Sequence, residues 1–260
     1  HDRFMFPLIG HTNRINAIVD GPTTDQIITL SNDCTLRLWT FKKTENGIDG
    51  ECDLVMKFAD PMSTCCYMED RGLLFVAGWD RMIRAIDLNT CKIIKSWPAS
   101  QEAIHTLAMY DNKIFAAGVD SIIRSWDMES GEMQMYDGHR SWVMTLAFKA
   151  KQPEEGSIGE ETMHFMYSAG DDKNIFVWDL DTGKVVEQLI GHENTVTAMD
   201  FSGSDLITTG LDSMVLGWDL QEMYDRVEEK LEMWKQHLAS LTFERHFEAS
   251  KKKKGKKKKP

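Results

Sequence analysis

The sequence predicts an all-β protein built from five copies of one supersecondary unit. A turn aspartate is followed six positions later by a large apolar residue in five places: Asp33 and Trp39, Asp80 and Ile86, Asp120 and Trp126, Asp172 and Trp178, and Asp212 and Trp218. Between the two members of each pair, apolar and polar residues alternate, which is the period of a strand. A spacing that recurs this regularly indicates one structural unit copied along the chain.

Each unit contains further β-like sequence before its turn aspartate. A Gly-His pair precedes three of the units, at Gly10-His11, Gly138-His139 and Gly191-His192. Between the pair and the turn lies another stretch of strand character, such as INAIVD, VMTLAF or VTAMDF. Each unit is therefore expected to contribute several antiparallel strands.

These motifs closely resemble the WD-repeat β-propeller family, which is named for its Trp-Asp ending. The resemblance covers roughly residues 4–220, with units ending near 40, 87, 127, 179 and 219. It implies four antiparallel strands per blade, arranged radially around a channel. Five units of about 43 residues each predict five blades. Phe4 to Ile9 is predicted to be an outer strand that pairs with the last unit and closes the ring.

The chain begins at His1 rather than at a methionine. This favours a piece of a longer protein, and members of the family more often have seven blades. A seven-bladed parent with further blades upstream therefore stays open.

The resemblance also implies a buried hydrogen-bonded set of His, Ser or Thr, Asp and Trp in each unit. Three units carry the whole set: His11, Thr29, Asp33, Trp39; His139, Ser168, Asp172, Trp178; and His192, Thr208, Asp212, Trp218. The second and third units lack Gly-His and have Val76 and Ala116 at the hydroxyl position, so weaker networks are expected around Asp80, Asp120 and Trp126. We interpret all these residues as structural rather than as catalytic acids, bases or metal ligands.

The family's topology implies which residues form the upper rim. They precede each turn aspartate or open each inner strand: Arg14, Asn16, Asn32, Trp79, His105, Val119, Trp142, Met144, Asp171, Thr195, Thr197 and Leu211. Trp79 and Trp142 are predicted to anchor a peptide or protein partner, with Arg14 and Asp171 selecting polar groups, because exposed tryptophans are typical of binding hot spots. The alternative is that each tryptophan folds back to fill a local gap.

Two polar insertions interrupt the units, at residues 42–53 and 149–162. We expect both to be solvated loops on the face opposite the turn aspartates.

The segment after residue 220 changes to helical periodicity. Residues 221–250 contain no Gly or Pro, and an apolar seam runs through Tyr224, Val227, Leu231, Trp234, Leu238 and Leu241. Such an amphipathic helix must bury its stripe, either against the lower rim of the propeller or against another helix in a short coiled coil.

The charge of the chain is divided unevenly. Residues 251–260 hold eight lysines, Lys251 to Lys254 and Lys256 to Lys259, which leaves 22 basic against 41 acidic residues elsewhere, a net charge of −19. The lysine segment is predicted to be disordered. Its possible roles are solubility, nuclear import, or contact with a polyanion such as RNA, an acidic protein tail or anionic lipid.

No motif predicts chemistry. A phosphate-binding loop, a His-Glu-x-x-His motif, a nucleophile elbow and zinc-type Cys/His spacing are all absent from the sequence. We therefore expect no enzymatic activity, cofactor, metal or small-molecule substrate, and no apolar run is long enough for a transmembrane segment. Five cysteines without a pairing pattern favour free thiols in an intracellular protein, in the nucleus because of the lysines or otherwise in the cytoplasm.

Two functions follow from these expectations. The first is a non-catalytic scaffold that binds a partner on the rim and is tethered to a larger assembly by its helix and lysine segment. The alternative is an RNA-associated protein of a nuclear or nucleolar ribonucleoprotein, which binds through its lysines.

Overall fold

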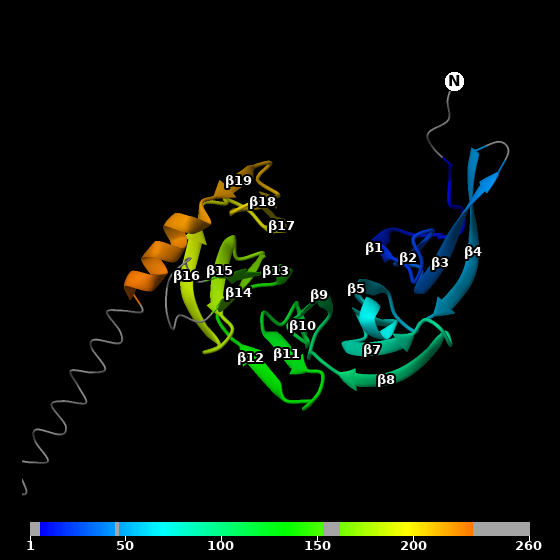
Figure 1. The fold of residues 1–260 in the computed structure, drawn as a ribbon, viewed down its shortest axis with the longest axis horizontal. Coiled ribbons are helices and arrows are strands. Elements are labelled where there is room, and N and C mark those ends of the chain that lie inside the picture. Colours follow the sequence, from blue (N-terminus) through cyan, green and yellow to red (C-terminus); the bar gives the residue numbers. More distant parts are fainter. Residues whose placement is uncertain (1–5, 45–46, 153–161, 231–260) are drawn as a thin grey trace, which may run out of the picture. The chain divides into compact units, whose positions relative to one another are not determined.

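The computed structural model of the chain describes residues 6–44, 47–152 and 162–230. The strands form five sheets, which we call blades 1 to 5 in chain order (Figure 1). Blades 1 to 4 have four strands each, and blade 5 has three, in the order β17-β18-β19. Neighbouring strands within blades 1 to 4 are antiparallel.

The strands of blades 1 to 3 are β1 (Ile15–Asp20), β2 (Gln26–Ser31), β3 (Thr35–Thr44), β4 (Gly47–Lys57), β5 (Met62–Met68), β6 (Leu73–Gly78), β7 (Met82–Asp87), β8 (Lys92–Pro98), β9 (Ile104–Tyr110), β10 (Lys113–Gly118), β11 (Ile123–Asp127) and β12 (Met133–Tyr136). A 3-10 turn, η1 (Glu69–Arg71), joins β5 to β6. The strands of blades 4 and 5 are β13 (Val143–Lys151), β14 (Met163–Gly170), β15 (Asn174–Asp179), β16 (Lys184–Ile190), β17 (Val196–Ser202), β18 (Asp205–Gly210) and β19 (Val215–Trp218).

The chain divides into two compact units. The first comprises residues 1–200 and 208–216, and the second comprises residues 201–207 and 217–260. Blades 1 to 4 lie entirely in the first unit, as do both residues of every side-chain pair discussed below.

The core of the first unit lies between consecutive blades. Because side chains alternate along a strand, β6 sends Leu74 and Val76 toward blade 1, and Phe75 and Ala77 toward blade 3. Strand β10 does the same one blade later, and its Phe115 packs in the cluster that contains Trp178 of blade 4. A middle strand buried on both faces therefore joins its blade to both neighbours, which explains its nearly continuous apolar sequence.

All five blades share one turn between their second and third strands. The residue after the turn aspartate has a left-handed backbone with φ of 60° to 68° at Cys34, Arg81, Ser121, Lys173 and Ser213. In each turn the aspartate Oδ1 accepts a hydrogen bond from the N–H two residues later, at 3.0 to 3.3 Å. None of the five left-handed residues is glycine, so the aspartate's hydrogen bond helps to hold a conformation that such residues rarely adopt.

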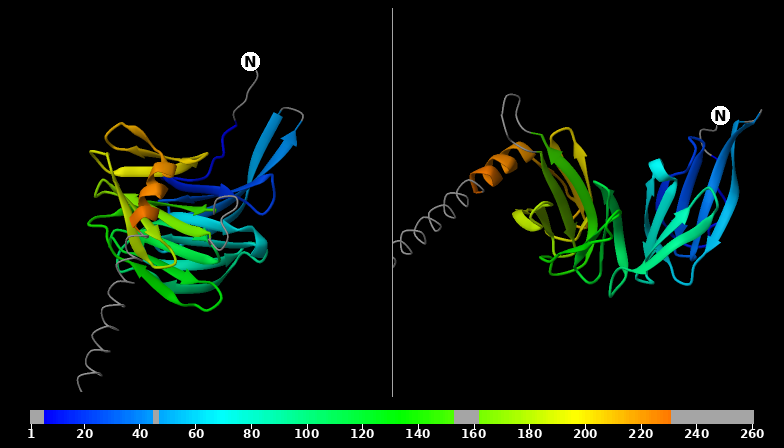
Figure 2. Two further views of the ribbon diagram at one scale, coloured as in Figure 1. Left: turned by 60° about the vertical axis from the view of Figure 1, so that its left-hand side comes forward. Right: turned by 60° about the horizontal axis from the view of Figure 1, so that its bottom comes forward.

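The insertion at residues 42–53 is not the solvated loop that the sequence predicted. Strands β3 and β4 extend through it as one long hairpin, which projects beyond β1 and β2 of the same blade (Figure 2). Phe41 lies opposite Gly50, and an ion pair joins Lys42 to Glu51. Cross-strand pairing thus satisfies backbone groups that composition alone assigned to a loop. In the second insertion, β13 reaches Lys151 and β14 begins at Met163, while residues 153–161 lie outside the described residues.

The strand predicted for Phe4 to Ile9 is wrong over its described part, since residues 6–10 have no strand pairing. Phe6 instead packs edge to face on Phe41, with ring centroids 5.6 Å apart. Leu8 lies so close to Gly50 that a Cβ there would meet its Cδ2 at 2.1 Å. Pro7 lacks the N–H that a strand partner would need, which favours this packed arrangement over a strand.

The second unit contains a helix whose described part covers residues 220–230. Asp219 caps it, because its Oδ1 accepts the N–H groups of Gln221 and Glu222 at 2.9 and 3.2 Å. The buried face consists of Leu220, Met223, Tyr224 and Val227. Two residues of the predicted seam, Tyr224 and Val227, are thus covered within this chain rather than open to a partner helix. Leu231, Trp234, Leu238, Leu241 and the lysine segment lie outside the described residues.

Among the residues that the structure describes, no helix has the length and apolar character that crossing a membrane requires.

Candidate interaction surface and the networks that support it

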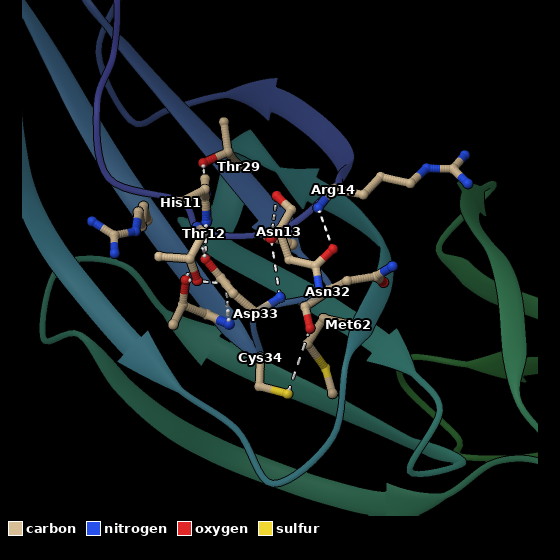
Figure 3. A network of polar contacts seen from close by, with 12 residues as sticks. His11, Thr12, Asn13, Arg14, Thr29, Asn32, Asp33, Cys34 and Met62 are labelled. Atoms are coloured by element: carbon tan, nitrogen blue, oxygen red, sulfur yellow. Dashed lines mark hydrogen bonds and ion pairs between the residues drawn. The ribbon is translucent and has the colours of Figure 1, made fainter.

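Blades 1, 4 and 5 each join a histidine to the turn aspartate and to a hydroxyl. In blade 1, His11 Nδ1 lies 2.8 Å from Asp33 Oδ2 and His11 Nε2 lies 2.7 Å from Thr29 Oγ1 (Figure 3). Trp39 Nε1 donates to the same Thr29 oxygen at 2.8 Å. The equivalent contacts in blade 4 join His139, Asp172, Ser168 and Trp178 at 2.7 to 2.8 Å. In blade 5, His192 contacts Asp212 at 2.7 Å and Thr208 at 2.8 Å.

The neighbouring donor and acceptor groups determine which ring nitrogen of the histidine carries the proton. An indole N–H can only donate, so the Trp178 Nε1–H occupies an acceptor site of the Ser168 oxygen. The aspartate can only accept, so His139 Nδ1 carries the proton that points at Asp172. When the imidazole is neutral, the Ser168 hydroxyl donates to His139 Nε2, so each side chain of this network has a hydrogen-bond partner.

Hydrogen bonds keep the network carboxylates ionised. Burial alone would raise the pKa of Asp33, but hydrogen bonds from the Thr35 side chain, the Thr12 N–H and the His11 ring outweigh it and lower that pKa far below its usual range. Burial also opposes the shift at Asp212, whose pKa is lowered to about 2 by hydrogen bonds from the His192 ring and the N–H groups of Met214 and Glu193. Asp172 is shifted downward in the same way, chiefly by His139. These carboxylates therefore remain anionic acceptors at neutral pH.

Blades 2 and 3 hold their turn aspartates with arginine instead of histidine. Arg84 forms an ion pair with Asp80, and Arg124 Nη1 lies 2.7 Å from Asp120 Oδ2. Both pairs are largely buried, with side chains of 9% to 17% exposure, and Ser100 adds a hydroxyl donor to Asp120 at 2.9 Å. The prediction from the sequence missed these arginines. Their signal was an Arg four residues after the aspartate in the two units without Gly-His.

A repeated backbone bond defines the rim. The residue before each turn aspartate donates its N–H to a carbonyl just before the inner strand, in the pairs Asn32 to Arg14, Trp79 to Pro61, Val119 to Ala103, Asp171 to Trp142, and Leu211 to Thr195, at 2.8 to 3.0 Å. The structure therefore places the predicted rim residues at equivalent positions of successive blades. Inner strands β1, β5, β9 and β13 contact one another in that order, so the rims of blades 1 to 4 are continuous.

An apolar arc occupies the rim of blades 2 to 4; its residues are Pro61, Trp79, Ala103, Val119, Trp142 and Met144. Trp79 is 59% exposed and Trp142 is 48% exposed, so neither folds back to fill a gap. His105 stacks against Trp142 at a tilt of 39°, with ring centroids 5.5 Å apart, and its Nε2 is buried without a partner among the described residues. Burial lowers the pKa of His105, which keeps its ring neutral at pH 7.

The polar rim residues bond largely to one another. Asn16 Nδ2 donates to Asn32 Oδ1 at 2.7 Å and to the Met62 carbonyl at 2.9 Å, which links blade 1 to blade 2. Asp171 accepts from Ser141 and Thr195, each at 2.7 Å, and these bonds lower its pKa. Thr195 is only 8% exposed. The structure thus places these residues in contacts between and within blades, whereas the side chain of Arg14 points away from the network (Figure 3).

Within the described ranges, no group of three or more His, Cys, Asp and Glu side chains has the arrangement of a metal site.

Comparison with known families identifies the repeat. Residues 3–40, 131–179 and 183–219 match the family model described as WD domain, G-beta repeat. These segments carry the three Gly-His units, and residues 41–130, with the two arginine-paired turns, lie between the matches. A solved structure, the WD40 β-propeller domain of Doa1, superposes with a TM-score of 0.64 at 20% identity, covering 82% of this chain and 68% of the other. The chain belongs to the WD-repeat family, and its fold is a five-bladed β-propeller followed by a helix.

Two curated relatives show how broad this similarity is. The nuclear distribution protein nudF of Aspergillus niger is 24% identical over 74% of this chain and 41% of its own length. A ribosome biogenesis protein WDR12 homolog of Oryza sativa subsp. japonica is 23% identical over 79% of this chain and 52% of its own length. The chain thus spans about half the length of these relatives. WD-repeat propellers are typically scaffolds for protein–protein interaction.

Proposed function

We propose that this protein is a non-catalytic scaffold that binds a peptide or protein on the apolar arc of its rim. The exposure of Trp79 and Trp142 is the observation that carries the proposal. Large aromatic side chains that stay exposed on a packed scaffold are the usual anchors of binding hot spots. The turn aspartates below them are held by internal partners, Arg84 in blade 2 and His139 in blade 4, which supports a role for the surface.

The arrangement of the arc supports a partner that presents apolar groups. Trp79 precedes the turn aspartate of blade 2, and Trp142 lies just before the inner strand of blade 4, so the two anchors flank blade 3. Arg14 lies on blade 1, next to the arc, and Asp171 lies on blade 4, within its range; there they would select polar groups of the partner. The helix and the lysine segment would tether the scaffold to a larger assembly.

Alanine substitution of both tryptophans tests this proposal. Trp79→Ala/Trp142→Ala should weaken capture of the bound partner at least about tenfold, measured by quantitative affinity purification and then by titration of the purified partner. Ile93→Ala/Ile94→Ala is the matched control, because those side chains are 45% and 56% exposed on β8, away from the rim. Unchanged capture by the tryptophan variant, or an equal loss in the control, would reject the rim as the binding surface.

A second candidate function is association with RNA in a nuclear or nucleolar ribonucleoprotein. Its support is the eight-lysine segment at residues 251–260, together with the similarity to a relative that is named a ribosome biogenesis protein. Deleting residues 251–260 should abolish RNA binding in this case and leave rim-dependent capture intact. If all eight lysines contact duplex phosphates, the log–log salt slope of binding should be about −7.

A further inference from the structure

A cavity opens at the end of the inner strands that lies opposite the rim. Its volume is about 590 Å³, and its lining comprises Val19 and Asp20 at the end of β1 together with residues 65–70 of β5 and η1. Strand β1 begins near the rim at Ile15 and ends at Asp20. Strand β5 of the next blade likewise begins near the rim, at Met62, and ends at Met68. The cavity therefore lies between blades 1 and 2, away from the tryptophans of the proposed binding surface.

The inner part of the cavity is apolar and uncharged. Val19 and Tyr67 are half-buried and pack on the cluster between blades 1 and 2, whereas the Met68 side chain packs on the cluster on the opposite face of β5. Cys65 lies on the same face of β5 as Tyr67 and Cys66 lies on the opposite face; burial raises the pKa of Cys65 to about 12 and also raises that of Cys66. Both thiols are thus protonated at neutral pH, so no charge lies at the base of the cavity.

The mouth of the cavity is negative. Asp20, Glu69 and Asp70 are exposed there, and no side chain among the described residues pairs with their carboxylates. None of the eight lining residues is basic, and the neighbouring Arg71 is not part of the lining. An apolar wall below unpaired carboxylates matches a side chain with an aliphatic stem and a cationic head, which is the chemistry of lysine and arginine.

We propose that this cavity binds a basic peptide segment of a partner protein. The aliphatic stems of its lysine or arginine side chains pack on Val19 and Tyr67, and their cationic groups lie among the three carboxylates. Charge complementarity supports this occupant, because residues 1–250 carry a net charge of −19 and three of their unpaired carboxylates lie at the mouth of the cavity. The scaffold would then have a second binding site, independent of the rim.

The peptide KKKKGKKKK tests the proposal by fluorescence anisotropy with the full chain at low salt. Asp20→Asn/Glu69→Gln/Asp70→Asn should weaken its binding at least about tenfold. Glu129→Gln/Glu132→Gln/Asp181→Asn changes the net charge equally at exposed sites elsewhere and should weaken binding less than about twofold. Tyr67→Ser, checked for an unchanged fold by circular dichroism, should weaken binding about threefold by removing part of the apolar wall.

Several outcomes would overturn the proposal. An equal loss in both triple variants would show that the peptide responds only to net charge, and full binding by Tyr67→Ser would show that the cavity wall takes no part. Absence of any binding to the full chain would also reject the site. The same peptide has the sequence of residues 251–259, so a chain lacking residues 251–260 must bind it within twofold of the full chain. A tenfold gain on that deletion would make the chain's own lysines the occupant and reject a partner's segment.

Discussion

Blades 3 and 4 have the same turn but hold its aspartate by different means. In blade 4 a histidine reaches Asp172 from the preceding segment and continues through Ser168 to a tryptophan that is 1% exposed. In blade 3 the partner of Asp120 is Arg124, which lies on β11, the strand that follows the turn. Ala116 occupies the position that Ser168 has in blade 4. The turn therefore requires a donor for its aspartate, whereas the histidine is one of two ways to provide it. Four predictions test this comparison and extend it to blade 5.

The largest difference is expected at the tryptophans. Trp178→Ala should lower the free energy of unfolding by about 4 kcal/mol, because it empties a buried site and leaves the Ser168 hydroxyl without its donor. Trp126→Ala should lower it by about 2 kcal/mol, because Trp126 is only partly buried. Urea unfolding measures both. If Trp178→Ala does not fold, Trp178→Phe, which loses only the indole donor and part of the ring, provides the comparison. Equal losses of stability at Trp178 and Trp126 would contradict this prediction.

Removing the arginine of blade 3 should have the next largest effect. Arg124→Met leaves the Asp120 carboxylate buried without its cation, at a cost of about 2 to 4 kcal/mol. Asp120→Asn/Arg124→Met should recover part of the loss, since the amide oxygen still accepts the Ile122 N–H and no charge remains buried. Arg140→Met, at an exposed arginine, should change stability by less than about 0.5 kcal/mol. A double variant no more stable than Arg124→Met would argue against an ion-pair role.

A smaller loss is expected when the hydroxyl of blade 4 is removed. Ser168→Ala should destabilise the protein by about 1 to 3 kcal/mol, because Trp178 Nε1 and His139 Nε2 then lose their shared partner inside the blade. Ser204→Ala is the control, since that hydroxyl is exposed between β17 and β18. Chemical unfolding that gave the same midpoint for Ser168→Ala and the wild type would show that the hydroxyl adds nothing to the network.

The histidine networks should also make stability fall in acid. Asp212 has a folded-state pKa of about 2, below the usual value near 4. Its contribution is therefore complete above about pH 4 and is lost as the pH falls toward 2. Unfolding midpoints measured from pH 7 to pH 2 should drop in this window. Asp212→Asn should make the pH dependence of the free energy of unfolding shallower, by no more than the contribution of one bound proton. A variant with the wild-type pH profile would remove Asp212 as a source of the acid dependence.

The sequence predicted the fold class because the five turns depend on short-range contacts. The aspartate, the left-handed residue after it and the strand behind it lie within six positions, so their spacing is visible in the chain. The hydroxyl and indole partners also lie at a fixed separation, ten positions apart in both Thr29 to Trp39 and Ser168 to Trp178. Regular strand pairing makes that separation constant.

The errors came from segments whose structure depends on distant partners. Residues 42–53 are polar enough for a loop, yet pairing of β3 with β4 makes them a hairpin. Phe6 and Leu8 have the pattern of a strand, but they pack on Phe41 and Gly50 instead. Arg84 and Arg124 stand at polar positions of alternating strands, where a solvent-facing arginine is the ordinary expectation. The acidic cavity could not be predicted, because Asp20 and Glu69 meet only when blades 1 and 2 pack together.

The backbone bond at the rim has a consequence for how this surface can diverge. A Cβ at Gly78, Gly118 or Gly170 would come within 1.9 to 2.2 Å of the carbonyl oxygens of Pro61, Ala103 and Trp142, so a side chain there would push the turn off the inner strand. The following residue contributes only its N–H to that bond, and its identity varies among Trp79, Val119 and Asp171. Blades 2, 3 and 4 thus each pair one restricted glycine position with one replaceable position, whereas blade 1 has Ser31 at the position of the glycine. New recognition surfaces can therefore arise by exchanging the second without disturbing the first.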